Sequence, residues 1–407
     1  MRRFEFIREN LRWLAAGALL TLLSGFGQTF FISIFAGEIR TEFDLSHGAW
    51  GGIYTLGTTA SAIAMVWAGG LTDRFRVRAL GAVVLLMLAF ACLAMAMAHA
   101  VWLLPLVIFA LRFTGQGMTS HIAVVAMSRW FIATRGKALS IAGLGFSLGE
   151  ALLPLTFVAL MVWVDWRLLW LAAAAIALLG IPALLALLRH ERTPQSMAKS
   201  DQSLGMNARH WTRNQVFSHR LFWFMVPALL GPSAFVTAFF FHQVHLAEIK
   251  QWAHVELVAL FPFYTAISIG AMVASGWALD KWGTPRLMPW IQLPMVAAFV
   301  VFAYAANPLI MLIGMFFLAL TTGANATLPN AFWAEFYGTA HLGSIKAMAA
   351  AVMVFGSAIG PGITGLVIDN GIGLEAQFIA VSAYFIFTTI MMKIGITRAR
   401  PALAVAA

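Results

Sequence analysis

The chain has 407 residues, of which 61% are hydrophobic and only 10% charged, and its mean hydropathy is +0.85. Soluble domains carry about a quarter charged residues, so this composition excludes one or two ordinary soluble domains. The apolar runs are also far longer than the alternating strands of an outer-membrane barrel. The sequence therefore predicts an all-α, polytopic membrane protein.

Apolar stretches of about 20 residues, separated by charged or Pro/Gly breaks, predict twelve transmembrane helices. They lie near 13–37, 49–71, 79–98, 101–127, 138–161, 168–188, 221–245, 255–279, 287–305, 309–333, 346–368 and 375–395. The first stretch is too long for the core of a signal peptide, so we expect it to remain as a transmembrane helix.

The basic residues are distributed unevenly between the two sides of the predicted topology. If the N-terminus is cytoplasmic, 22 of the 26 Lys and Arg residues fall on the cytoplasmic side. This asymmetry predicts that both termini lie inside and that the protein resides in the plasma (cytoplasmic or inner) membrane. The net charge of +10 then follows from the membrane topology and does not imply a nucleic-acid partner. The single cysteine, Cys92, offers neither a disulfide nor a cysteine metal site.

An internal repeat divides the predicted helices six and six. The longest polar stretch, 189–220, suggests an N-terminal bundle at 1–195, a cytoplasmic linker at 196–214 and a C-terminal bundle at 215–407. A constant shift of 207 residues superposes six pairs, which are Gly69 and Gly276, Asp73 and Asp280, Arg74 and Lys281, Gly136 and Gly343, Gly149 and Gly356, and Pro154 and Pro361. The sequence therefore predicts two six-helix bundles related by a parallel 6+6 duplication.

The repeated segments are two cytoplasmic loops, GGLTDRFRVR at 69–78 and GWALDKWGTPR at 276–286. They resemble the loop signature of the major facilitator superfamily. The match rests on Gly69, Asp73, Arg74, Arg78, Gly276, Asp280, Lys281 and Arg286. The resemblance implies a secondary transporter that works by alternating access, with these residues forming a gate. The alternative is positive-inside charge with an incidental carboxylate.

A narrower resemblance covers RWFIATRGKALSIAGLGFSLG at 129–149, which is similar to the monocarboxylate and oxalate–formate branch of the superfamily. Its supporting residues are Trp130, Phe131, Arg135, Gly136, Ala138, Gly145 and Gly149. The predicted eighth helix, 255–279, lacks the cation with which that branch binds its substrate.

Polar residues inside predicted helices are candidates for a substrate and proton pathway, because they are costly in lipid. They are Arg112, Glu150, Gln28, Gln116, His242, Tyr264 and Asn325. The rise of about 1.5 Å per residue along a helix places both Arg112 and Glu150 near mid-membrane. Two interpretations stay open: a permanent ion pair, or an anion-binding arginine beside a carboxyl that carries protons.

Glycines at helical spacing form a second set of candidates. Gly145, Gly149, Gly356 and Gly360, the last followed by Pro361, are expected to allow close helix packing. The sequence contains no Walker-type, zincin or nucleophile-elbow motif in a credible context. We therefore expect no enzyme activity, cofactor or bound metal, and transport driven by gradients.

These features favour a secondary active transporter, a monomer, that moves a small organic anion such as a monocarboxylate by proton-coupled symport. The alternative is a multidrug-type exporter or antiporter of amphipathic or cationic compounds, which the many aromatic residues would favour. A receptor or scaffold without transport is disfavoured by the duplicated loops.

Overall fold

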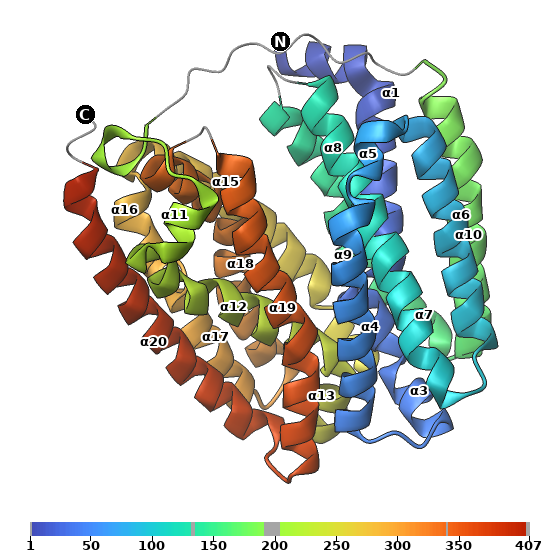
Figure 1. Cartoon of the computed structure of the whole chain (residues 1–407). Helices are drawn as coiled ribbons and strands as arrows, with labels where there is room; N and C mark the ends of the chain where they lie inside the picture. The colour runs from blue at the N-terminus through green and yellow to red at the C-terminus, as the bar shows by residue number, and fades with distance from the viewer. Residues whose placement is uncertain (1, 132–134, 191–203, 339–340, 404–407) are drawn as a thin grey trace. The chain divides into compact units, whose positions relative to one another are not determined.

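The computed structural model describes residues 2–131, 135–190, 204–338 and 341–403, and all regular elements in these ranges are helices (Figure 1). The chain divides into two compact units. The first comprises Met1–Lys199 with Phe240–His245, and the second comprises Ser200–Phe239 with Leu246–Ala407.

The first unit contains five long helical spans and one broken span. Its helices are α1 (Arg2–Leu23), η1 (Ser24–Gly27), α2 (Thr29–Ile32), η2 (Ser33–Phe35), α3 (Ala36–Glu42), α4 (His47–Ala68), α5 (Leu71–Arg74), α6 (Val77–Met97), η3 (Val101–Leu103), α7 (Leu104–Leu111), η4 (Arg112–Thr119), α8 (Ser120–Trp130), α9 (Arg135–Met161) and α10 (Trp166–Leu187).

The remaining helices belong to the second unit, except for the end of α12 and the start of α13. They are η5 (Met206–Ala208), α11 (Arg213–Ser218), α12 (Arg220–Phe241), α13 (Gln243–Lys250), α14 (His254–Val258), α15 (Phe261–Trp282), α16 (Thr284–Leu287), η6 (Met288–Trp290), α17 (Leu293–Tyr304), α18 (Pro308–Tyr337), α19 (Leu342–Asp369), α20 (Leu374–Ala399) and η7 (Arg400–Ala402).

Ten helices of the described residues are long and apolar enough to cross a membrane, and the bent pair Phe6–Gly27 and Thr29–Glu42 adds an eleventh if it counts as one span. The helix α4 occupies most of the predicted stretch 49–71 and has 22 residues. The predicted number of twelve spans, the 6+6 duplication and the side on which the termini lie stay predictions.

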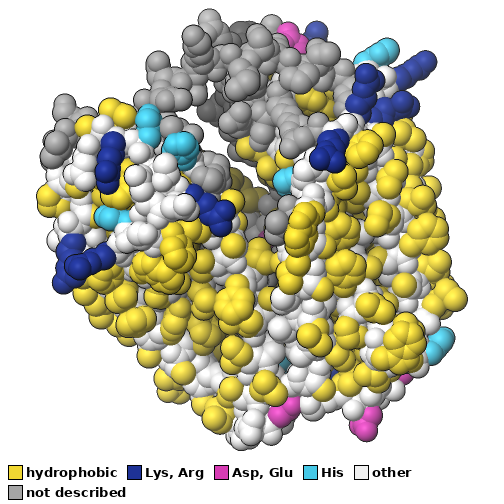
Figure 2. Space-filling model, in the orientation of Figure 1, with side chains coloured by type: hydrophobic (Ala, Val, Ile, Leu, Met, Phe, Trp, Pro, Cys, Tyr) yellow, Lys and Arg dark blue, Asp and Glu magenta, His cyan; other side chains and the backbone are white. Residues whose placement is uncertain are grey.

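The surface of the helices carries the apolar residues expected of a chain surrounded by lipid. Figure 2 shows hydrophobic side chains over the helices on the face in view. Large apolar residues such as Leu179 on α10 and Leu309 on α18 are 69% and 71% exposed. Exposed apolar surface of this extent is stable against lipid rather than water.

Glycines bring equivalent helices into contact in the two units. A Cβ on Gly145 of α9 would overlap the carbonyl oxygen of Ala18 in α1, and a Cβ on Gly360 of α19 would overlap that of Ala234 in α12. Gly149 lies against Leu22 and Gly356 against Leu230 in the same helix pairs. In each unit the first and fifth predicted spans therefore pack backbone to backbone, which only residues without a side chain permit.

Part of the predicted linker 196–214 is ordered within the second unit. The backbone N–H of Trp211 donates to the carbonyl of Tyr337 at 3.0 Å, and the Trp211 indole donates to the carbonyl of Met206. The bare Cα of Gly205 lies against the backbone of Tyr337 and Gly338, where a Cβ would approach within 2.5 Å. The segment from Gly205 onward is therefore attached to the end of α18, and 196–203 lie outside the described residues.

Candidate functional site

The first unit contains a buried arginine where two helices depart from regular geometry. Arg112 begins η4, an eight-residue π-helical segment inside the apolar stretch Val101–Met127. The first span is broken opposite it, and its two parts, which end at Gly27 and begin at Thr29, are bent by 47°. Segments of π-helix recur at functional sites because they expose backbone groups and shift side chains out of register.

Two glycines allow these irregular segments to touch. A Cβ on Gly27 would overlap the carbonyl oxygen of Leu111 and lie 2.7 Å from the Cα of Gly115. A Cβ on Gly115 would lie 2.6 Å from the Cα of Gly27. The broken end of η1 consequently presents its backbone carbonyls directly to the residues of η4.

Neutral groups hold the guanidinium of Arg112 in place. Its Nη1 donates to the carbonyl of Gly27 and to the hydroxyl of Thr29, both at 3.2 Å. Its Cζ lies 5.3 Å from the centre of the Tyr54 ring, and the Tyr54 hydroxyl is hydrogen-bonded to Thr29 at 2.5 Å. A cation over an aromatic face at this distance is attracted to the ring. Arg112 is 2% exposed, so desolvation makes its charge costly unless an anion approaches.

The opposite edge of this guanidinium makes no hydrogen bond to the described residues. Among the described residues, Nε is buried without a hydrogen-bond partner, and Nη2 also has none but is not fully buried. Nε and Nη2 form the side-on edge with which arginine binds the two oxygens of a carboxylate. The Nε and Nη2 groups of Arg112 therefore have no protein acceptor among the described residues.

The other predicted pathway residues of the first unit surround this site unequally. Gln28 is 8% exposed at the break between η1 and α2, and the half-buried Gln116 follows Gly115 in η4. Glu150 is half-buried in α9 and is not among the groups that contact Arg112 in the described chain. An ion pair between Arg112 and Glu150 stays a prediction. His242, 4% exposed, lies in the segment Phe240–His245 with its ring 6.0 Å from that of His47.

The second unit contains Tyr264 and Asn325. Tyr264 is 1% exposed in α15 and donates its hydroxyl hydrogen to Thr322 of α18 at 3.2 Å. Asn325 lies three residues further along α18, half-buried in the wall of a pocket.

The predicted gate residues lie at the ends of helices, and most are exposed. Asp73 is in α5 and Asp280 near the end of α15, but their side chains lie outside the described residues. Lys281 places its ammonium 5.2 Å from the Trp277 ring centre. Arg74, Arg78 and Arg286 are exposed, Gly69 accepts a hydrogen bond from Thr72, and Gly276 has open space beside it. Their role as a gate stays a prediction.

Sequence reasoning missed Gly27, Thr29 and Tyr54, which position Arg112. It also missed Glu335 of α18, which accepts hydrogen bonds from the backbone and hydroxyl of Thr284 within the second loop motif. Tyr54 could have been found from the sequence, because it is one of five tyrosines in the chain and lies inside a predicted span. Gly27 and Thr29 carried none, because nothing in their spacing shows which helix they face.

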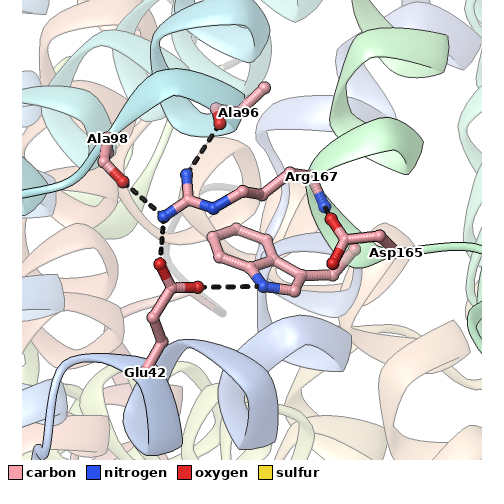
Figure 3. A network of polar contacts seen from close by, with 6 residues as sticks. Glu42, Ala96, Ala98, Asp165 and Arg167 are labelled. Atoms are coloured by element: carbon pink, nitrogen blue, oxygen red, sulfur yellow. Dashed lines mark hydrogen bonds and ion pairs between the residues drawn. The ribbon is translucent and has the colours of Figure 1, made fainter.

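A second polar network ties three helix ends of the first unit together (Figure 3). Arg167, at the start of α10, forms an ion pair with Glu42 at the end of α3 and donates to the carbonyls of Ala96 and Ala98 at the end of α6. The Trp166 indole also donates to Glu42, at 3.2 Å. These bonds satisfy carbonyls that the end of a helix leaves without partners.

The second unit has a corresponding network. Lys250, at the end of α13, lies 3.1 Å from a carboxylate oxygen of Glu375 at the start of α20 and donates to the carbonyl of Ala303 in α17. In both units, this network therefore joins the first, third and sixth predicted spans of the half.

The helical architecture and these sites can now be set beside known proteins. The family model of the Major Facilitator Superfamily matches residues 17–361. The chain belongs to the major facilitator superfamily. It is accordingly a multi-pass membrane protein with the fold of secondary transporters.

Two solved structures are similar to this chain over nearly its whole length. The nucleoside transporter NupG is 15% identical, with a TM-score of 0.73, over 95% of this chain and 98% of that one. A bacterial homologue of the human lysosomal transporter Spinster is 16% identical, with a TM-score of 0.66, over 97% and 96%. At these identities the likeness shows the fold alone. No curated protein matches the sequence.

Proposed function

We propose that this protein is a secondary active transporter of a small organic anion, with Arg112 as the cation that binds it. The observation that carries the proposal is a buried guanidinium whose Nε has no hydrogen-bond partner among the described residues and whose Nη1 is held by neutral groups. A monocarboxylate fits this edge, because its two oxygens accept two parallel N–H hydrogen bonds. Desolvation strengthens the interaction relative to water.

Alternating access gives the binding step its role in transport. In the superfamily's layout, two bundles alternately expose a central site, and the duplicated loops at 69–78 and 276–286 would brace one of the two states. The charge asymmetry supports an orientation with both termini in the cytoplasm of a cell whose plasma membrane holds the protein, as a monomer.

Glu150 is the proposed coupling group. It is a half-buried carboxyl in α9, a helix that packs closely on α1. Binding and release of a proton at Glu150 would let an inward proton gradient drive anion uptake by symport.

The test measures uptake of a panel of carboxylates into proteoliposomes that contain Arg112→Lys or Arg112→Gln, with and without a pH gradient. Lysine keeps the charge but loses the bidentate fork, so we expect weakened saturable uptake, and glutamine should abolish it. Arg220→Gln, which removes one exposed cation at the start of α12, is the matched control. Uptake by Arg112→Gln equal to that of the control would overturn the proposal.

A further inference from the structure

The second unit contains a pocket of about 440 Å³ enclosed by α12, α17, α18, α19 and α20 together with η6. This volume lies within the range of ligand pockets, about 300–1000 Å³. Neither Arg112 nor any residue in contact with it lines this pocket. An inference about its occupant therefore goes beyond the proposed function.

Methionines dominate the apolar wall. Five of them line the pocket, which are Met225, Met288, Met295, Met353 and Met392. Unbranched thioether side chains adapt to the shape of an apolar ligand, and they are common at binding surfaces that accept varied partners. All except Met353 are at most 3% exposed, whereas Met353 is 39% exposed. The pocket is thus apolar and adaptable at its closed end and opens near Met353.

Two polar residues, Lys346 and Asn330, lie in the more exposed part of the lining. Lys346 of α19, the one charged residue among the lining residues, lies two helical turns before Met353 and is half-buried. Asn330 of α18 is exposed on the same wall. An ammonium and a carboxamide at the mouth of an apolar pocket suit a ligand with an anionic head and an apolar body.

Two amides in the wall differ in their partners. Gln292 is satisfied by the protein, since its Nε2 donates to Ala228 and its Oε1 accepts from Thr388. Asn325 has no hydrogen-bond partner among the described residues, although it is half-buried. Its amide is therefore free to bond to water or to a ligand that displaces the water.

We propose that this pocket binds an amphipathic anion, with its apolar chain among the methionines, its anionic group at Lys346 and a hydrogen bond to Asn325. A single-chain carboxylate has this chemistry, whether it is a transported substrate or a molecule retained from the membrane.

The experiment measures binding of radiolabelled decanoate to the full-length protein in nanodiscs, with empty nanodiscs subtracted. Butyrate tests the role of the chain, because each buried methylene should contribute about fourfold in affinity. Decyltrimethylammonium tests the sign of the head group. We expect saturable binding of decanoate, far weaker binding of butyrate and none of the cation.

Variants locate the binding in the pocket. Lys346→Gln should weaken decanoate binding about tenfold, Asn325→Ala by a smaller factor, and Ala350→Phe, which fills the pocket, should also reduce it. Lys393→Gln removes a cation of α20 that does not line the pocket and should leave binding unchanged. Thermal unfolding of each variant shows that it is folded.

Outcomes for this pocket and for the proposed transport function can be separated. The variant Arg112→Gln should still bind decanoate if the pocket is a site of its own. Decanoate uptake by the wild type identifies a substrate, and binding without uptake identifies a retained ligand of the same chemistry. Decanoate affinity that is equal in the wild type, Lys346→Gln and Ala350→Phe would overturn the inference.

Discussion

Lys250 and Glu375 form in the second unit the ion pair that Glu42 and Arg167 form in the first, with the two charges exchanged between helices. Glu42 and Lys250 are 208 positions apart, as are Arg167 and Glu375. The cation changes helix, but in both units it donates to the end of the third span, at Ala96 in one and Ala303 in the other. The interaction is thus shared by the two halves although the residue types are not.

Because the charges are exchanged between the two units, we expect the ion pair of Glu42 and Arg167 to tolerate an exchange of its two charges. Arg167→Glu should cost about 1–2 kcal/mol of unfolding free energy, because two carbonyls lose their donor and two carboxylates face each other. Adding Glu42→Lys should recover part of this loss, since a lysine there would reproduce the arrangement of Lys250. Thermal unfolding of both single variants and the double variant measures the coupling. Strictly additive losses would show that the pair contributes nothing.

The contact between Gly27 and Gly115 should be essential to the Arg112 site. Gly27→Ala and Gly115→Ala each insert a Cβ into the facing backbone, so we expect lower thermal stability and at least tenfold weaker anion binding. Gly52→Ala is the matched control, because a Cβ there meets no atom within 4 Å. Anion affinity in Gly27→Ala as high as in Gly52→Ala would mean that the helix break does not position the arginine.

Glu150→Gln should separate exchange from coupling. Glutamine mimics a carboxyl that keeps its proton, so exchange of preloaded anion should continue while stimulation by an inward proton gradient disappears. Glu38→Gln, which changes an exposed carboxylate of α3, provides the control. Gradient-driven accumulation that persists in Glu150→Gln would assign proton coupling to another residue.

Tyr54 should support Arg112 mainly through its ring. Tyr54→Phe removes the hydroxyl bonded to Thr29 but keeps the aromatic face, so anion affinity should fall only a few-fold. Tyr54→Leu also removes the attraction between ring and cation and should reduce affinity further. Direct binding measurements on the purified variants test the order, and equal affinities of the two would contradict it.

His219, which precedes α12 and shares a hydrogen bond with the Tyr337 hydroxyl, should make stability depend on pH. Burial and, to a smaller extent, the charge of Arg209 lower the pKa of His219 below its usual value. The unfolded chain therefore takes up a proton first as pH falls, and this contribution to stability is present above about pH 6.5 and lost below it. The melting temperature of the wild type should fall more between pH 7.5 and 5.5 than that of His219→Gln, and identical falls would contradict the prediction.

Much of the helical layout followed from one-dimensional patterns. The stretch Val101–Met127 coincides with a predicted span, and the ends of α6 and α10 lie within a few residues of their predicted positions. The length of an apolar run has to match the thickness of the bilayer, so it can be read without knowing any contact. The break at Gly27 was not predicted, because a Gly-rich segment in a span is compatible with both a straight helix and a bent one.

For the candidate site, the sequence determined which buried groups needed an explanation, and the tertiary structure decided their partners. Arg112 and Glu150 were conspicuous as ionisable residues deep in apolar stretches, and equal depth made them candidates for pairing. Depth is set by position along a helix, but contact also depends on the direction in which each helix turns its side chains and on which helices are neighbours. Packing of Gly27 on Gly115 brought the carbonyl of Gly27 and the hydroxyl of Thr29 to Nη1, and it left Nε of Arg112 without a partner among the described residues.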